Sequence, residues 1–198
     1  MRVAQIMAGQ EIGGAELFYA RLTSALAHDT DLSQIALLRP HARWLNMLET
    51  AGVPMHTYSF GGRLDVQTKR GLRSQLEAFG ADVALNWMSR AARFCPSGGW
   101  TNAARLGGYY SLKYYQNCQA FVGNTQGICA YLRKQGVSDE RVHYIPNFID
   151  ERPLSPDNAT QFPTSKRDDQ AVLLAAGRLH KNKGFDVLIE ALALVPSA

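Results

Sequence analysis

The chain has 198 residues, a net charge of +4 and a hydrophobic fraction of 46%, which together exclude a disordered chain. The charge is too small to indicate nucleic-acid binding in the absence of a nucleic-acid-binding motif. It suits acidic small-molecule substrates or an anionic membrane surface. No apolar run is long enough to span a bilayer, and three cysteines without a CxxC pair favour reduced thiols in a cytoplasmic protein (Cys95, Cys118, Cys129).

Strand and helix patterns alternate through the first three quarters of the chain. We expect strands at 2–7, 33–39, 53–60, 82–88, 101–108, 119–125 and 141–148, and helices at 13–27, 42–52, 67–80 and 126–136. In the first helix, the spacing predicts one buried face made of Phe18, Leu22, Ala25 and Leu26. This alternation predicts an α/β fold with a doubly wound, parallel, Rossmann-like sheet, whose ligands bind at the carboxyl ends of the strands.

The composition changes after residue 149. Residues 150–169 contain three prolines and many polar residues, which indicates an interdomain linker. Residues 170–177 are almost wholly apolar and predict a strand, and a helix with an apolar stripe follows at 185–195. We therefore expect one domain at 1–149 and the first β-α unit of a second Rossmann-like domain at 170–198.

A glycine-rich motif, GQEIGGAE, joins the first strand to the first helix. Gly13 and Gly14 let a ligand approach the backbone, Glu16 follows them, and the helix N-terminus favours an anion. The spacing does not match the dinucleotide fingerprint GxGxxG. The motif is either a phosphate- or sugar-binding turn or a plain strand-to-helix turn.

A second motif, GRLHKNKG, starts at Gly177 just after the last apolar strand. Arg178 and Lys183 stand on either side of a turn that leads into a helix. Two cations beside a helix N-terminus form a suitable diphosphate clamp. The alternative is a solvated basic loop.

Three further features allow two interpretations each. The segment YIPNFID contains Asn147 at a turn. The segment 107–117 places Lys113 among four tyrosines that either stack on sugar rings or pack on the sheet. A basic group meets anionic lipid or forms a solvated face (Arg63, Lys69, Arg70, Arg73). The five histidines show no metal-ligand spacing, so no metal site is expected.

These motifs together resemble family 4 glycosyltransferases of the two-Rossmann architecture known as GT-B. The resemblance covers essentially the whole chain and is strongest over LLAAGRLHKNKGFDVLIEALALV. The segments GGAE, VGNTQGICAYLRKQGV and YIPNFID occur in the family's order and approximate spacing. Each segment is weakly specific alone, and the four in register carry the resemblance.

The resemblance implies a role for each motif. Arg178 and Lys183 would hold the diphosphate of a nucleotide-sugar donor and neutralise it as it leaves. Gly13 and Gly14 would line the cleft near the donor phosphates and the acceptor, and Asn147 would lie at the hinge between domains. The family retains the anomeric configuration without a metal or other cofactor, and the departing phosphate helps to deprotonate the acceptor.

The sequence departs from the family pattern at two histidines and at its end. Trp87 stands at one usual histidine position and Gly107 at the other, and Arg105 or Tyr109 is the expected replacement. The family's E-x7-E motif for the donor lies beyond the range of this chain. We therefore expect an N-terminal part of a longer enzyme that is inactive alone.

The leading hypothesis is the acceptor-binding part of a retaining hexosyltransferase-type enzyme for lipopolysaccharide or other cell-surface glycans. Its partners would be a nucleotide-sugar donor and a glycan or lipid-linked acceptor, with no nucleic acid. It would be cytoplasmic, with peripheral contact at the inner face of the membrane. The alternatives are a non-catalytic binding or scaffold protein and a GT-B-like nucleotide-sugar epimerase.

Overall fold

The computed structural model describes residues 1–9, 13–62, 64–149, 173–177 and 179–195. The chain divides into two compact units, Met1–Ile149 and Asp150–Ala198, and each is described by itself. The predicted linker 150–169 and Arg178 lie outside the described residues.

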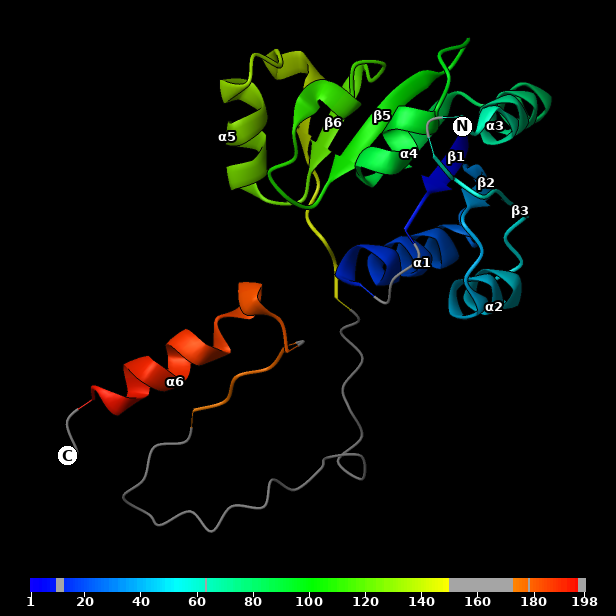
Figure 1. Cartoon of the computed structure of the whole chain (residues 1–198). Coiled ribbons are helices and arrows are strands. Elements are labelled where there is room, and N and C mark those ends of the chain that lie inside the picture. Colours follow the sequence, from blue (N-terminus) through cyan, green and yellow to red (C-terminus); the bar gives the residue numbers. More distant parts are fainter. Residues whose placement is uncertain (10–12, 63, 150–172, 178, 196–198) are drawn as a thin grey trace. The chain divides into compact units, whose positions relative to one another are not determined.

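A seven-stranded parallel sheet forms the centre of the first unit (Figure 1). The strand order is β3-β2-β1-β4-β5-β6-β7, and every neighbouring pair is parallel. The chain therefore builds outward in both directions from the β1–β4 pair, which confirms the predicted doubly wound sheet. The strands are β1 (Arg2–Met7), β2 (Ser33–Leu38), β3 (Met55–Thr57), β4 (Val83–Trp87), β5 (Thr101–Leu106), β6 (Ala120–Gly123) and β7 (Val142–Tyr144).

Helices cover both faces of this sheet (Figure 1). Side chains of α1 and α2 pack in one hydrophobic cluster with β1 and β2, whereas α3 and α4 contribute to a cluster on the opposite face. A third cluster joins α5 to β5 and β6. The helices of this unit are α1 (Gly14–Leu26), α2 (Ala42–Thr50), α3 (Val66–Phe79), α4 (Met88–Phe94) and α5 (Gln126–Lys134).

The buried face of α1 differs from the predicted one. Phe18 is buried as expected, but Ala25 is exposed, and the face toward the core includes Tyr19 and Thr23. The Tyr19 hydroxyl donates to the backbone oxygen of Gln5, 3.5 Å away. This hydrogen bond lets the Tyr19 hydroxyl enter the core. Leu22 packs partly buried against the same cluster, so the predicted face was wrong at Ala25 and lacked Tyr19 and Thr23.

Strand lengths also differ from prediction at the two edges of the sheet. β3 and β7 have three residues each, whereas eight-residue strands were expected. Both are edge strands with a neighbour on one side only, and short edges limit unwanted pairing. The apolar pattern of β5 is interrupted by polar residues in the sequence. The strand nevertheless lies inside the sheet, between β4 and β6, and five of its six residues are buried. Helix α4 was not predicted.

The basic group on α3 has mixed surroundings. Leu72 and Leu76 are buried, whereas Lys69 and Arg70 are exposed. Arg73 is not free, because it pairs with Glu77 and donates to the backbone oxygen of Ser97. Arg63 lies outside the described residues. Membrane contact through this group stays a prediction.

The second unit contains a 3-10 turn, η4 (Lys181–Lys183), and the helix α6 (Phe185–Ala193). Residues 173–177, within the predicted strand, form no strand, because a strand needs a hydrogen-bonded neighbour. The apolar stripe of α6 is largely uncovered, and Ile189 is 68% exposed. Among the described residues, none of the helices has the length and apolar character needed to cross a bilayer.

Candidate functional site

Two adjoining cavities lie at the carboxyl ends of the central strands, where β1 and β4 start opposite halves of the sheet. We call them the arginine cavity, of about 250 Å³, and the glutamate cavity, of about 460 Å³. Met88 and Tyr110 line both. The arginine cavity is also lined by Gly14, Ala15, Phe18, Trp87, Arg105, Gly107, Asn124 and Asn147. The glutamate cavity is also lined by Ala8, Gly9, Glu16, Arg39, Ser89 and Arg90.

Arg105 is the central side chain of the arginine cavity. It lies near the end of β5 and is 5% exposed. One terminal nitrogen donates to the backbone oxygen of Ile145 at 3.2 Å, and the other donates to Oδ1 of Asn147 at 2.7 Å. The guanidinium therefore ties β5 to the segment that follows β7, and Asn147 reaches the cavity through this contact.

Two aromatic rings hold the Arg105 guanidinium from the α1 side of the sheet. Its central carbon lies 4.8 Å from the ring centroid of Phe18 and 5.2 Å from that of Trp87. The Trp87 indole is fixed in turn, because its N–H donates to Oε1 of the buried Gln5 at 2.9 Å. Trp87 thus occupies an expected histidine position as a buried support for the cation.

The charge of Arg105 has no counter-ion in the described part of the chain. It forms no ion pair there, and both of its hydrogen-bond acceptors are neutral. Burial lowers the pKa of the guanidinium, yet arginine stays protonated in proteins. A buried cation stabilised only by carbonyl groups and rings can attract an oxyanion or a developing negative charge.

Glu16 defines the second cavity and explains two of the glycines. It is 5% exposed and lies in the first turn of α1, where the helix dipole favours a carboxylate. A Cβ added at Gly9 or Gly13 would collide with its carboxylate, whereas one added at Gly14 would meet no atom within 4 Å. No other described residue pairs with this carboxylate, although Arg39 and Arg90 line the same cavity.

The junction of β4 and α4 is strained at Met88. This residue has a φ of 68°, a left-handed conformation that a residue with a Cβ rarely adopts. The turn places Met88 between the two cavities and starts α4 directly after the strand. Strained backbone of this kind often occurs at functional sites.

Asn124 brings an unused acceptor to the arginine cavity. It directly follows β6, and its buried Oδ1 has no hydrogen-bond partner among the described residues. Gly107, which follows β5, is exposed, and a Cβ added there would lie 3.8 Å from the amide nitrogen of Asn124. A ligand hydroxyl could donate to an oxygen in such a position.

The structure separates the two tyrosines at the end of β5. Tyr110 lines both cavities, whereas Tyr109 is 68% exposed and packs edge-on against Tyr131, with ring centroids 5.4 Å apart. The structure therefore brings Arg105 to the cavity and does not bring Tyr109 there, and replacement of the family histidine by Arg105 stays a prediction. Of the four tyrosines at positions 109, 110, 114 and 115, Tyr115 is the buried one.

The proposed donor clamp belongs to the second unit. Lys183 is exposed at the end of η4, and Gly184 follows with a φ of 62° before α6 begins. Arg178 lies outside the described residues, so the clamp stays a prediction. Within the described ranges, no group of three His, Cys, Asp or Glu residues could hold a metal ion.

Sequence comparison finds two relatives that function in lipopolysaccharide synthesis. The chain is 34% identical over 197 residues to the lipopolysaccharide core biosynthesis glycosyltransferase LpsD of Rhizobium meliloti, and 30% identical over 199 residues to LpsE of the same organism. These matches include 97% and 99% of this chain, but only 55% and 57% of the relatives. The chain thus spans just over half of their length. No family model matches the sequence.

Solved structures share the fold at low sequence identity. Anabaena HepE in complex with UDP matches 76% of this chain and 45% of its own, with 16% identity and a TM-score of 0.58. A glycosyltransferase from Rickettsia africae matches 79% and 46%, with 10% identity and a TM-score of 0.62. The UDP-GlcNAc 2-epimerase of Neisseria meningitidis matches 74% and 47%, with 15% identity and a TM-score of 0.52.

These likenesses agree with the strand order of the first unit. The parallel sheet with helices on both faces is that of a Rossmann-like half of a GT-B protein. Over nearly its whole length, the chain is similar in sequence to lipopolysaccharide core glycosyltransferases.

Proposed function

We propose that this chain forms the acceptor-binding part of a retaining glycosyltransferase that transfers a hexose from a nucleotide-sugar donor to a lipopolysaccharide core acceptor. The observation that carries the proposal is Arg105, a buried cation without a counter-ion at the carboxyl end of the sheet. The sequence likeness to core glycosyltransferases supplies the reaction class. The fold likeness to HepE with UDP supports a uridine nucleotide as donor.

The proposed reaction exchanges one bond at the anomeric carbon of the donor sugar. The bond from C1 to the phosphate oxygen breaks, and its electron pair leaves with the nucleoside diphosphate. The acceptor oxygen forms the new bond to C1 on the same face, and its proton passes to the departing phosphate. Negative charge grows on the diphosphate during this step, so nearby cations lower the barrier.

Each strand-end residue has a role in this proposal. Arg105 would hold the acceptor or the donor phosphate through its remaining N–H groups, while Asn147 fixes its orientation. Asn124 would accept a hydrogen bond from a sugar hydroxyl. Glu16, held among the glycines, would orient an acceptor hydroxyl from the other cavity.

The second unit would supply the donor site. Arg178 and Lys183 would neutralise the leaving diphosphate, and no metal would be needed for that step. The expected cost of Lys183→Ala is at least about tenfold in turnover or donor affinity, the usual scale for a charge-assisted contact. A matched control is Lys134→Ala, a charge removed from the exposed end of α5.

The function is tested by an assay for transfer. Protein expressed from its full open reading frame is incubated with each UDP-hexose, with and without a deacylated core oligosaccharide, in the presence of EDTA. The expected product is the oligosaccharide plus one hexose, with the anomeric configuration of the donor retained in its NMR spectrum. Failure of every donor to extend any core acceptor would contradict the proposal.

The same assay decides the second candidate, a nucleotide-sugar epimerase. That candidate is favoured by the fold likeness to the Neisseria meningitidis UDP-GlcNAc 2-epimerase. An epimerase would convert UDP-GlcNAc into an isomer without any acceptor. We expect no isomer, because the two sequence relatives are glycosyltransferases.

A further inference from the structure

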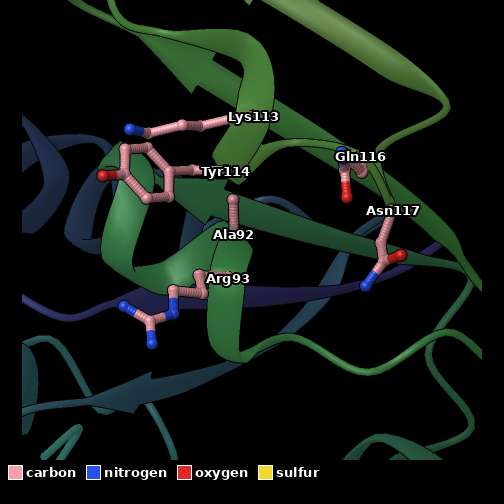
Figure 2. A pocket seen from close by; sticks show the side chains of 6 residues that line it. All are labelled: Ala92, Arg93, Lys113, Tyr114, Gln116 and Asn117. Carbon is pink, nitrogen blue, oxygen red and sulfur yellow. The ribbon is translucent and has the colours of Figure 1, made fainter. Parts of the chain in front are cut away.

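A third cavity lies to the side of the strand ends, between α4 and the 3-10 turn η1 (Leu112–Tyr114). Its volume is about 450 Å³. We call it the basic groove, and Figure 2 shows the residues that line it: Ala92, Arg93, Lys113, Tyr114, Gln116 and Asn117. In that view, the small Ala92 side chain separates Arg93, Lys113 and Tyr114 from the amides of Gln116 and Asn117.

The groove carries two positive charges that no carboxylate neutralises. No acidic residue lines it, and neither Arg93 nor Lys113 forms an ion pair within the described part of the chain. The Lys113 ammonium lies 4.9 Å from the ring centroid of Tyr114. Figure 2 shows the two side chains next to each other. That contact orients the ammonium without cancelling its charge, so the charge remains available to a ligand.

The floor of the groove is part of the packed core. Ala92 is 2% exposed, and Tyr115 beneath η1 is 1% exposed. The hydroxyl groups of Tyr115 and Ser89 lie 3.0 Å apart and form a hydrogen bond between α4 and the end of η1. The two walls are therefore held together, and the groove has a fixed shape.

A row of cations connects the groove with the strand-end site. Arg90 and Arg93 are three residues apart on α4, which places them on one side of the helix about 4.5 Å apart along its axis. Arg90 lines the glutamate cavity, and Arg93 lines the groove. An elongated ligand with its reacting end at the strand ends could thus continue along α4 into the groove.

We propose that the basic groove binds an oxyanion group, a phosphate or a carboxylate, on the part of the acceptor glycan away from its reacting end. The inference rests on the proposed function, because it takes the acceptor to be a glycan. Arg93 and Lys113 would bind the oxyanion, and the amides of Gln116 and Asn117 would bind neighbouring hydroxyl groups. A concave site with amide groups fits a glycan better than it fits the flat surface of a membrane.

The test measures acceptor binding without any donor. A phosphorylated, deacylated core oligosaccharide is titrated into the protein, expressed from its full open reading frame, by calorimetry at low salt. The same oligosaccharide after phosphatase treatment and a trigalacturonate probe distinguish phosphate from carboxylate. We expect Arg93→Gln and Lys113→Gln each to raise the Kd for the charged probe about tenfold, as losing a charge-assisted hydrogen bond does.

Matched variants separate this effect from general changes in charge or folding. Lys134→Gln removes a positive charge on α5, outside the cavities described above, and should leave the Kd unchanged. Arg93→Lys keeps the charge and should restore most of the affinity. The groove site is overturned if Arg93→Gln and Lys113→Gln bind the glycan like Lys134→Gln, including the case in which both variants lose affinity only for anionic lipid vesicles. Sugar transfer by the unmodified protein would still support the proposed function in either case.

Discussion

At the level of single residues, the proposed sugar transfer depends on an arginine whose charge is not compensated. Arg105 donates to the amide oxygen of Asn147 at 2.7 Å, and no described carboxylate pairs with it. The positive charge is therefore available to a ligand in the cavity. A substitution at Asn147 that keeps the hydrogen bond but cancels this charge should alter ligand binding.

Asn147→Asp tests this charge directly. The new carboxylate keeps the acceptor oxygen in place but forms an ion pair that cancels the charge toward the cavity. We expect the KM for acceptor or donor to rise at least about tenfold, as for the loss of a charge-assisted contact, with little loss of stability. Steady-state kinetics measure the KM, and a melting curve measures the stability. An unchanged KM would show that Arg105 does not bind an anion.

The glycines beside Glu16 give a second test at this scale. A methyl group at Gly13 would push the Glu16 carboxylate aside, whereas Gly14 has open space around it. We expect Gly13→Ala to reduce the free energy of unfolding by about 1 kcal/mol relative to Gly14→Ala, through overpacking. In a Glu16→Ala background this difference should vanish, as measured by urea unfolding, and its persistence would place the clash elsewhere.

Some of the site residues could be predicted because parallel strands present their carboxyl ends together. The glycine-rich motif after the first strand predicted Gly13 and Gly14, and the family resemblance predicted Arg105. The strand-end rule would also have found Arg39 and Asn124, since each directly follows a strand. Tyr110 could not be separated from Tyr109 in this way, because the choice depends on the path of the loop after β5.

At the scale of the element, α3 is held by an unusually complete N-terminal cap. Both carboxylate oxygens of Asp65 accept hydrogen bonds: one from the backbone N–H of Thr68 at 2.9 Å, and the other from its hydroxyl at 2.6 Å. The second oxygen also accepts from Ser59 and from the backbone of Gly61, both at 2.7 Å. The helix ends at Gly80, whose φ of 62° is a left-handed conformation that favours glycine.

Loss of this cap should weaken α3 in a pH-dependent way. The hydrogen bonds from Thr68, followed by those from Ser59 and Gly61, hold the pKa of Asp65 below its ordinary value. Its contribution to stability is therefore present above the unfolded pKa, near 3.9, and is lost as the pH falls through the lower folded value. Asp65→Ala should cost about 1 kcal/mol near neutral pH, measured by urea unfolding.

The control for this prediction is Asp65→Asn, which keeps an acceptor but cannot titrate. Its stability should depend less on pH than that of the unmodified protein between about pH 2 and pH 5. Parallel pH profiles of the two proteins would exclude Asp65 as the titrating group.

Two elements show why local sequence patterns are not enough to predict every helix and strand. Helix α4 has seven residues and follows β4 without a loop, so no separate capping signal precedes it. Strand β5 contains Asn102 and Arg105, which weakened its apolar pattern. Both polar side chains are buried and hydrogen-bonded. The Asn102 amide donates to the backbone oxygen of Pro96 and accepts from the Trp100 indole N–H, and Arg105 donates to Asn147.

At the scale of the whole molecule, the topology of the first unit could be predicted because alternating strands and helices allow few arrangements. The order β3-β2-β1-β4-β5-β6-β7 is that of a doubly wound sheet, in which the chain reverses direction across the sheet once, between β1 and β4. The donor clamp depends on how a second unit meets the first, and no local pattern in the sequence fixes that geometry.

The cysteines report on the integrity of the first unit as a whole. All three are buried, and burial raises the pKa of Cys95 and of Cys118 to about 12. Because the thiolate is the reactive form, a thiol reagent at pH 8 should label them slowly in the native protein and rapidly in urea. Rapid labelling without denaturant would show that the core of this unit opens readily.

The most direct test of a role for Arg105 in sugar transfer is the activity of Arg105→Ala and Arg105→Lys. Arg70→Ala, at an exposed position of α3, is the control. Transfer of labelled hexose from its UDP donor to a core oligosaccharide gives kcat/KM for each protein. We predict a loss of at least about a hundredfold for alanine, the scale of a lost charge stabilisation in a transition state, with partial recovery by lysine. Equal kcat/KM values for Arg105→Ala, Arg70→Ala and the unmodified protein would contradict a role for the arginine cavity in sugar transfer.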